Sequence, residues 1–236
     1  ASYTNTKSLK FPTASSAYLN GQHINVTALQ RTGNGSGASD AWSISIWIKP
    51  STATNTQTIF YYGGDDLANE GRIELSQFSG GNIIFRYGST NNNLNFIGVG
   101  NFPTGQWNHV LLTYDGGTTG SNSADISSYF GRFSMFINGN NGVSQVQHNN
   151  YGFASGIPAD KFRIGRLLGA TTSAYLLDGI VNQVAIWGTD ESANVATIYN
   201  GGATQDLSTL SSAPVHYYEI DSSITTIADL AGNADF

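Results

Sequence analysis

The sequence predicts an all-β fold, a sandwich or a barrel of short strands. Strand-like apolar runs recur along the chain with turn residues between them, a spacing typical of such folds. Only 11% of the residues are charged, against about a quarter in an average globular protein. The runs, in order, are SLKF, AWSISIWIK, QTIFYY, GRIELSQ, NIIFRYG, LNFIGVG, WNHVLLTYD, RFSMFING, KFRIGR and DGIVNQVAIW. Because all-β sandwiches of this length often form one domain, we expect residues 1–236 to be a single domain.

The clearest strand is AWSISIWIKP, in which two sets of residues alternate. Since successive side chains of a strand point to opposite faces, the more apolar set should face the core. This set is Trp42, Ile44, Ile46 and Ile48. The opposite set is Ser43, Ser45, Trp47 and Lys49.

The stretch FSMFINGNNGV predicts a tight hairpin turn. Asn138 and Gly139 stand between two strand-like runs, and this pair tolerates the positive φ angles that a two-residue hairpin requires.

One segment, TDESANVATIYNGG, has the pattern of a helix. Asp190 or Ser192 can cap its start and Gly201 can end it. Val195, Ile198 and Tyr199 lie on one face. We therefore expect one short helix near residues 190–200.

Charge and cysteine content exclude several classes of function. The formal net charge is -6, and the 10 Lys and Arg residues do not cluster along the sequence, so we expect no nucleic-acid partner. There is no cysteine, and hence no disulfide or thiolate metal site. No apolar run reaches the ~20 residues of a membrane helix, so we expect no membrane partner. No basic-then-apolar leader opens the chain, which is consistent with synthesis in the cytosol, but a cleaved leader would leave the same start and the compartment stays open.

The ordered series of motifs resembles a known family. SLKF with AYLNG, AWSISIWIKP, GQWNHVLLTYDG, FSMFINGN, FRIGR and DGIVNQVAIWGTDESANVATIYNGG are similar to the laminin-G-like branch of the concanavalin A-like lectin/glucanase superfamily. The resemblance spans about Ser8 to Gly202. It implies a jelly-roll β-sandwich of two antiparallel sheets. The ending IYNGG with DLSTLS is most similar to laminin-G-like domains in structural proteins of tailed phages.

Two features depart from the family pattern. Family members often have acidic residues where this chain has Asn20 and the pair Asn182 and Gln183, which weakens the case for their calcium site. The tail, residues 212–236, resembles the segment that family members place before their first strand. We expect His216 to Ile220 to add a strand to the same sandwich. The alternative is the start of a second, truncated repeat.

The stretch GQWNHVLLTYDG contains a Trp, a His and an Asp, but strand geometry argues against an active site. His109 and Asp115 share a face of an extended strand at a separation of ~20 Å, too far to interact. Both faces are largely apolar, which favours a structural strand. One face carries Trp107, His109 and Leu111, and the other carries Val110, Leu112 and Tyr114.

No catalytic motif is present. A jelly-roll glucanase needs carboxylates alternating along one strand about 5 Å apart. The sequence around Glu219 and Asp221 lacks the third acidic residue, and Glu74 has no acidic neighbour two residues away. There is also no zinc-binding helix motif, phosphate-binding loop or nucleophile elbow. We therefore expect no enzymatic activity.

The loop GGDDLANEG is dense in oxygen ligands for a chain this poor in charge, and calcium favours such ligands. The candidate metal ligands are Asp65, Asp66, Asn69 and Glu70. The alternative, typical of such residues, is a solvated hairpin loop whose acids keep the edge soluble.

A sugar ligand would use aromatic rings for stacking and amides for its hydroxyl groups. The candidate ligand-binding residues are Tyr61, Tyr62, Asp65, Asp66, Asn69, Asn91, Asn92 and Asn93. Tyr87, Tyr151 and Tyr175 also lie near strand ends or in loops, whereas the resemblance implies burial for Trp42, Trp47, Trp107 and Trp187.

We therefore expect a non-enzymatic adhesion module on a phage particle, as a decoration or fibre protein, which contacts other virion proteins or cell-surface glycans. Two alternatives stay open: a carbohydrate-active enzyme of the same fold, and a purely structural capsid decoration protein without a ligand. A secreted or cell-surface location is the alternative to the virion. The oligomeric state also stays open, a homo-oligomer included.

Overall fold

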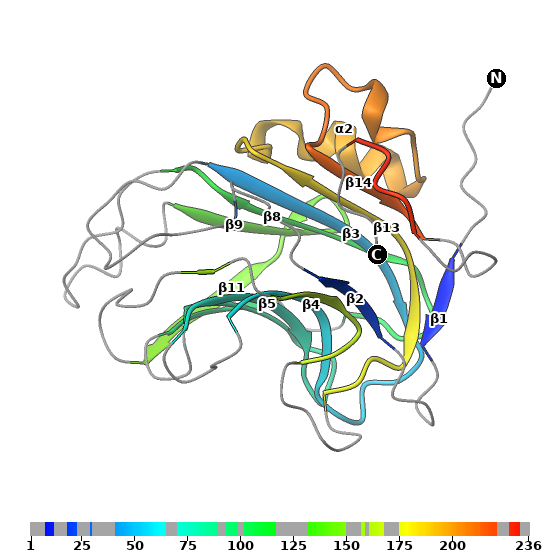
Figure 1. Ribbon diagram of the computed structural model, residues 1–236. Coiled ribbons are helices and arrows are strands. Elements are labelled where there is room, and N and C mark those ends of the chain that lie inside the picture. The colour runs from blue at the N-terminus through cyan, green and yellow to red at the C-terminus, as the bar shows by residue number, and fades with distance from the viewer. Residues whose placement is uncertain are drawn as a thin grey trace.

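The chain forms two facing antiparallel sheets, as Figure 1 shows. This computed structural model describes residues 8–11, 18–22, 29, 41–64, 70–88, 93–98, 102–116, 132–149, 157–158, 161–167, 175–220 and 227–231. The predicted fold class, a β-sandwich with one short helix, is confirmed for this part of the chain.

Sheet A has seven strands. Six follow the order β1-β13-β3-β8-β9-β10, and β14 also pairs with β13. Their bounds are β1 Leu9–Phe11, β13 Gly179–Trp187, β3 Trp42–Pro50, β8 Asn108–Tyr114, β9 Phe133–Ile137, β10 Asn140–Asn141 and β14 His216–Glu219.

Sheet B also has seven strands, in the order β11-β7-β6-β5-β4-β12-β2. Their bounds are β11 Val143–Asn149, β7 Asn93–Gly98, β6 Ile83–Gly88, β5 Arg72–Gln77, β4 Gln57–Gly63, β12 Lys161–Ile164 and β2 Leu19–Gln22. In Figure 1 this sheet is curved, with its concave face turned away from sheet A.

The core lies between the two sheets and confirms the alternation expected for β3. Trp42, Ile44, Ile46 and Ile48 are all buried in it. Sheet B contributes every second residue from its own inner face, including Phe60, Tyr62, Ile73, Leu75, Phe85, Tyr87 and Phe162. Alternate residues of each strand thus enter the core, and their neighbours point outward.

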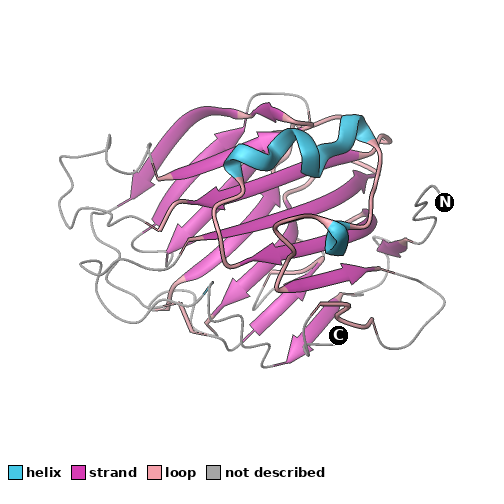
Figure 2. Cartoon of the chain, turned by 90° about the horizontal axis from the view of Figure 1, so that it is seen from above, coloured by secondary structure: helices cyan, strands magenta, loops and turns pink. Residues whose placement is uncertain are grey.

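The outer face of sheet A is buried as well. A second apolar cluster joins Leu111, Ala185 and Trp187 of the strands to residues of the segments that follow β13. These segments are η2 Ser192–Asn194, α2 Val195–Tyr199, η3 Asn200–Gly202 and η4 Leu207–Thr209. Seen from above in Figure 2, the helical turns lie across the strands. Sheet A is therefore covered on both sides around β8 and β13.

The helix has the predicted position but ends one residue before the expected Gly201. Asp190 Oδ1 accepts a hydrogen bond from the Ser192 backbone N at 2.9 Å, which satisfies a donor at the start of the first helical turn. Asn200 ends α2 in the left-handed region, with φ 48°, and Gly201 follows with φ 61°.

The hairpin predicted at Asn138 and Gly139 is confirmed. Their φ angles are 51° and 77°, and Ile137 pairs with Asn140 across the turn. Asn138 also ties the turn to β8, because its Oδ1 accepts a hydrogen bond from the His109 backbone N at 2.8 Å.

Strands from the two ends of the chain share one edge of β13. β1 pairs with Gly179–Val181, and β14 pairs with Gln183–Ile186. Between them the pairing of β13 with β3 shifts at a bulge that follows Val181. Residues of the expected C-terminal strand thus pair within sheet A, while the single-domain organisation of residues 1–236 stays a prediction.

Asp229 holds β14 in place. Its Oδ1 accepts hydrogen bonds from the backbone N of Tyr217 at 2.9 Å and of Ala231 at 3.2 Å, and its Oδ2 lies 2.5 Å from His216 Nδ1. Beyond β14, the neighbouring Ile220 and Ile227 are buried in the main core.

Asp229→Ala is expected to lower the free energy of unfolding by about 1–3 kcal/mol, because it leaves buried donors unsatisfied. Urea denaturation measures the change, with Leu230→Ala as the control, since Leu230 is 54% exposed. Deleting residues 212–236 should cost more than either substitution. An unchanged midpoint after the deletion would contradict the single-domain prediction.

Among the described residues, no helix combines the length and the apolar character that crossing a bilayer requires.

Candidate functional site

The candidate site lies on the outer face of sheet B, where polar side chains of adjacent strands form a row. The strand register places Arg163 of β12 opposite Tyr61 of β4, Tyr61 opposite Glu74 of β5, and Glu74 opposite Arg86 of β6. This face therefore carries charge in a chain that has little.

Glu74 is at the centre of this row and is fully buried. Its Oε1 accepts hydrogen bonds from Arg86 Nη1 and Ser76 Oγ, both at 2.6 Å. Its Oε2 accepts one from Arg72 Nε at 2.8 Å. Both carboxylate oxygens are thus used, and the contacts fix two guanidinium groups in place.

The charge state of Glu74 follows from these partners. Burial by itself would raise the pKa of this carboxyl group, but the charges of Arg86 and Arg72 and the hydrogen bonds from Ser76 and Arg72 bring the pKa below its ordinary value of 4.5. Glu74 is therefore an ionised group held by two cations, which is unsuited to donating a proton at neutral pH.

Gly63 allows the backbone of β5 to approach β4 closely beside Arg72. Its φ is +145°, and a Cβ at this position would lie 2.7 Å from Arg72 Cα. The glycine thus lets β4 pair closely with β5 at Arg72, and no larger residue fits there.

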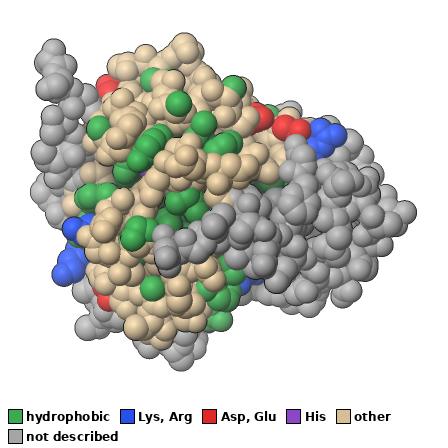
Figure 3. Space-filling model, turned by 180° about the vertical axis from the view of Figure 1, so that it is seen from behind, with side chains coloured by type: hydrophobic (Ala, Val, Ile, Leu, Met, Phe, Trp, Pro, Cys, Tyr) green, Lys and Arg blue, Asp and Glu red, His purple; other side chains and the backbone are tan. Residues whose placement is uncertain are grey.

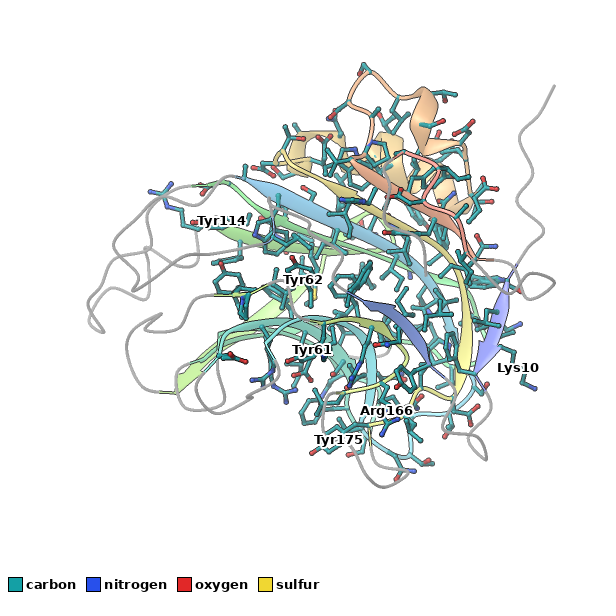
Figure 4. All side chains as sticks on the ribbon, in the orientation of Figure 1. Lys10, Tyr61, Tyr62, Tyr114, Arg166 and Tyr175 are labelled. Carbon is teal, nitrogen blue, oxygen red and sulfur yellow. The ribbon has the colours of Figure 1, made fainter. Side chains whose placement is uncertain are left out.

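Tyr61 and Tyr62, both expected to contact a ligand, lie on opposite sides of sheet B, as Figure 4 shows. Tyr62 belongs to the core between the sheets and is fully buried, which leaves its ring no exposed surface. Tyr61 is on the outer side and also fully buried, and its hydroxyl donates a hydrogen bond to Gly64 O at 2.6 Å. In this position Tyr61 supports the row rather than presenting a free ring.

Beside this row, two arginines stack on one tyrosine. The guanidinium carbon of Arg163 lies 5.3 Å from the centre of the Tyr18 ring, and that of Arg166 lies 4.8 Å from it. All three side chains are half-buried. Cation–π contacts of this kind hold the guanidinium planes in a defined place.

Tyr175 is an exposed aromatic residue held in an unusual conformation. Its side chain is 38% exposed, and its φ of 66° lies in the left-handed region that bulky residues rarely adopt. Its backbone N donates to Thr56 O at 3.0 Å, and its carbonyl accepts from Thr58 N and Leu167 N. Figure 4 shows Tyr175 and Arg166 on the outer side of sheet B. Strained positions that the surrounding structure enforces are concentrated at binding sites.

The loop expected to bind a metal is mostly outside the described residues. Of its candidates only Glu70 is described, and it lies so close to Gly64 that a Cβ there would overlap its carboxylate. Asp65, Asp66, Asn69, Asn91 and Asn92 lie outside the described residues, and Asn93 is the first residue of β7. The described part of the chain contains no group of three or more His, Asp or Glu side chains placed to bind a metal. Calcium binding by this loop stays a prediction.

Among the other tyrosines considered, Tyr87 is a core residue and Tyr151 lies outside the described residues.

The stretch GQWNHVLLTYDG is a structural strand. Val110, Leu112 and Tyr114 face the core, and Leu111 faces the second cluster. Asp115 pairs with Arg132 at 3.0 Å, not with His109. The burial expected of Trp107 is wrong, because its side chain is 40% exposed just before β8 begins.

His109 is buried on the outer side of sheet A. Its Nε2 is hydrogen-bonded to Ser45 Oγ at 2.8 Å, and its ring centre lies 5.0 Å from that of Trp47. The described residues provide no partner for its Nδ1. Burial lowers the pKa of His109 from its ordinary 6.5 to about 3. The imidazole is therefore neutral in the native protein.

His109 should make the protein less stable as the pH falls from about 6.5 to about 3. In this window the unfolded chain binds a proton at His109 and the native state does not, so stability rises with pH by up to ~1.4 kcal/mol per pH unit. Urea denaturation across this range should give His109→Gln a shallower slope than the unaltered protein. Parallel pH profiles would contradict the assignment.

Sequence reasoning missed the arginines of the candidate site. Arg86 is far in the sequence from Arg163 and Arg166, and only the register of four strands brings Arg86 and Arg163 to one face. The available signal was their alternation with core residues, since Arg86 follows Phe85 and Arg163 follows Phe162.

The four strands at the centre of this face carry few groups that could take part in hydrolysis. Hydrolysis of a glycosidic bond by the usual mechanism needs two carboxyl groups about 5–9.5 Å apart, one of them protonated. Strands β4, β5, β6 and β12 together carry a single carboxylate, Glu74, and it is ionised. The guanidinium groups and the exposed ring of Tyr175 can hydrogen-bond and stack instead.

Comparisons with known proteins agree with this architecture. The Laminin_G_3 family model, of the concanavalin A-like lectin/glucanases superfamily, matches residues 20–196. No curated protein sequence matches the chain significantly.

Solved structures share the fold at low sequence identity. A protein of Bacteroides ovatus ATCC 8483 that is proposed to bind carbohydrate superposes with a TM-score of 0.60 at 18% identity, covering 99% of this chain and 58% of its own. A heptameric SAP-like pentraxin from Limulus polyphemus superposes with a TM-score of 0.53 at 17% identity, covering 84% of both chains. The binding domain of botulinum neurotoxin serotype D superposes with a TM-score of 0.52 at 16% identity, covering 85% of this chain and 44% of its own. The chain thus has a lectin-like fold and spans little more than half of the Bacteroides protein.

Proposed function

We propose that this chain, which belongs to the concanavalin A-like lectin/glucanase superfamily, is a non-catalytic module that binds glycans through the outer face of sheet B. Since one fold supports both enzymes and binding proteins, the proposal depends on the site rather than on the fold.

The observation that carries the proposal is a set of partly exposed groups on the outer face of sheet B. Tyr61 and Glu74 on this face are fully buried, whereas Arg86, Arg163 and Arg166 are half-buried and Tyr175 is exposed. Polar groups on a rigid sheet next to an aromatic ring suit a hydroxyl-rich ligand.

The neighbours in structure support binding over catalysis. The Bacteroides protein is proposed to bind carbohydrate, and the neurotoxin segment is a binding domain. The alternative, a carbohydrate-active enzyme, needs a second carboxyl group near Glu74, and the strands around Glu74 supply none.

The setting we propose is a phage virion, where the chain is a decoration or fibre protein. The support is the resemblance of IYNGG with DLSTLS to phage structural proteins. Many copies on one particle would convert a modest affinity per site into firm attachment. Mass spectrometry of purified phage particles tests this setting. Absence of the protein from the particles would contradict the proposed setting.

A glycan array combined with a hydrolysis assay tests the function. We expect bound glycans, a loss of binding in Tyr175→Ala, and no release of reducing sugar from laminarin, agar or carrageenan. Turnover that one carboxylate substitution abolishes would establish the enzyme instead. An array without any bound glycan, together with stoichiometric binding to particles, would favour a purely structural decoration protein.

A further inference from the structure

The basic residues of the chain are concentrated on the candidate binding face. β4, β5, β6, β12 and residues 165–167 carry five of the ten Lys and Arg residues but one of the sixteen Asp and Glu residues. The five are Arg72, Arg86, Lys161, Arg163 and Arg166. Among the residues that Figure 3 colours in the view from behind, charged side chains are few and scattered. A protein of net charge -6 thus gathers half of its positive charge on one face.

Glu74 offsets only part of this charge. One carboxylate holds Arg72 and Arg86, so this group of three keeps a net positive charge. Arg86 remains 18% exposed, and its guanidinium carbon lies 4.9 Å from the centre of the Phe78 ring. Its orientation is therefore fixed while part of its surface faces solvent.

Arg163 and Arg166 form a second positive group. Both guanidinium carbons lie close to the Tyr18 ring, and the backbone of Arg166 is bridged to Leu176, next to Tyr175. Arg163 and Arg86 are three strand spacings apart in the register, roughly 14 Å. The two positive groups are thus spaced for an extended ligand rather than for a small ion.

We propose that the ligand is an acidic glycan, whose carboxylate or sulfate groups bind Arg163, Arg166 and Arg86 while a sugar ring stacks on Tyr175. This inference rests on the proposed glycan-binding function and names the class of glycan. Guanidinium groups match carboxylate and sulfate oxygens with paired hydrogen bonds. The ring of Tyr175 supplies an apolar face for the sugar, and its backbone hydrogen bonds keep it in place.

Charge complementarity predicts how this binding depends on salt. Salt screens half-buried cations only in part. A higher ionic strength still weakens the attraction between these cations and an approaching polyanion. The acidic remainder of the molecule repels the same ligand, which confines binding to this face.

Affinity electrophoresis and titration calorimetry test the proposal with three polysaccharides: polygalacturonate with carboxylates, carrageenan with sulfates, and a neutral galactan. We expect at least one acidic polymer to bind, the neutral galactan to bind more weakly, and added salt to reduce the binding. Arg163→Gln with Arg166→Gln should weaken binding by roughly tenfold to a hundredfold. Lys10→Gln is the matched control, because Lys10 is an exposed cation on β1 of sheet A and its loss should leave the affinity unchanged.

The outcomes separate the two proposals. Equal binding of neutral and acidic polymers would overturn the acidic ligand and leave glycan binding standing. No binding to any glycan would overturn both. If the double arginine variant still binds the acidic polymer with unchanged affinity, the assignment of the site would be wrong. The thermal midpoint must show that this variant is folded. Tyr175→Phe should keep the affinity and Tyr175→Ala should lose it, which distinguishes stacking from a role of the hydroxyl group.

Discussion

Glu74→Gln is expected to lower the free energy of unfolding by about 3–5 kcal/mol, because it leaves two guanidinium groups on a buried face without their counter-charge. Arg72 and Arg86 bond to Glu74 at 2.8 Å and 2.6 Å, and the carboxylate has no exposed surface. Urea denaturation at neutral pH measures the loss.

The matched control is Asp115→Asn, which breaks the ion pair with Arg132. Both side chains of this pair are about a third exposed, so its loss should cost less than about 1 kcal/mol. Glu74→Gln should also flatten the acid limb of the stability curve. Since the pKa of Glu74 is lowered in the native protein, its contribution is complete above its ordinary pKa and is lost as the pH falls through the native pKa. A loss no larger than that of the control would contradict this account of the face.

Trp42→Ala should be as damaging, with a loss of about 3–5 kcal/mol, because it opens a cavity between the sheets. The indole ring lies 6.0 Å from the ring of Tyr114 and 6.2 Å from that of Phe133 in sheet A. It also lies 6.1 Å from Phe85 and 6.3 Å from Tyr87 in sheet B. One side chain thus joins both halves of the core.

Trp107→Ala is the control for Trp42, since it removes the same ring from an exposed position. We expect a change within about 0.5 kcal/mol. Thermal or urea unfolding of both variants measures the difference. Equal losses for the two tryptophans would contradict the placement of Trp42 at the centre of the core.

Local patterns predicted the fold well. The alternation from Trp42 to Ile48 and the turn at Asn138 and Gly139 depend on residues close together in the sequence, so they could be recognised there. The same alternation did not reveal that Ser43 and Ser45 are buried too. Their burial depends on the segments after β13, where Glu191 donates its backbone N to Ser43 Oγ.

The candidate site could not be predicted in the same way. Its charged row needs the register of β12, β4, β5 and β6, and a shift of one residue would turn each side chain to the opposite face. The sequence showed that Glu74 has no acidic neighbour, which argued against a glucanase. It did not show that Arg72 and Arg86 bind this carboxylate. The left-handed φ of Tyr175 also has no sequence signal, since the residue is not a glycine or an asparagine.

The divided edge of β13 also bears on how the protein avoids self-association. Nine residues long and largely apolar, β13 would be a template for strands of another molecule if its outer backbone groups were open. β1 and β14 close this template in two pieces, on either side of the bulge after Val181. Detachment of either piece would leave several peptide groups of an apolar strand unpaired, and such an edge is a template for pairing with another molecule.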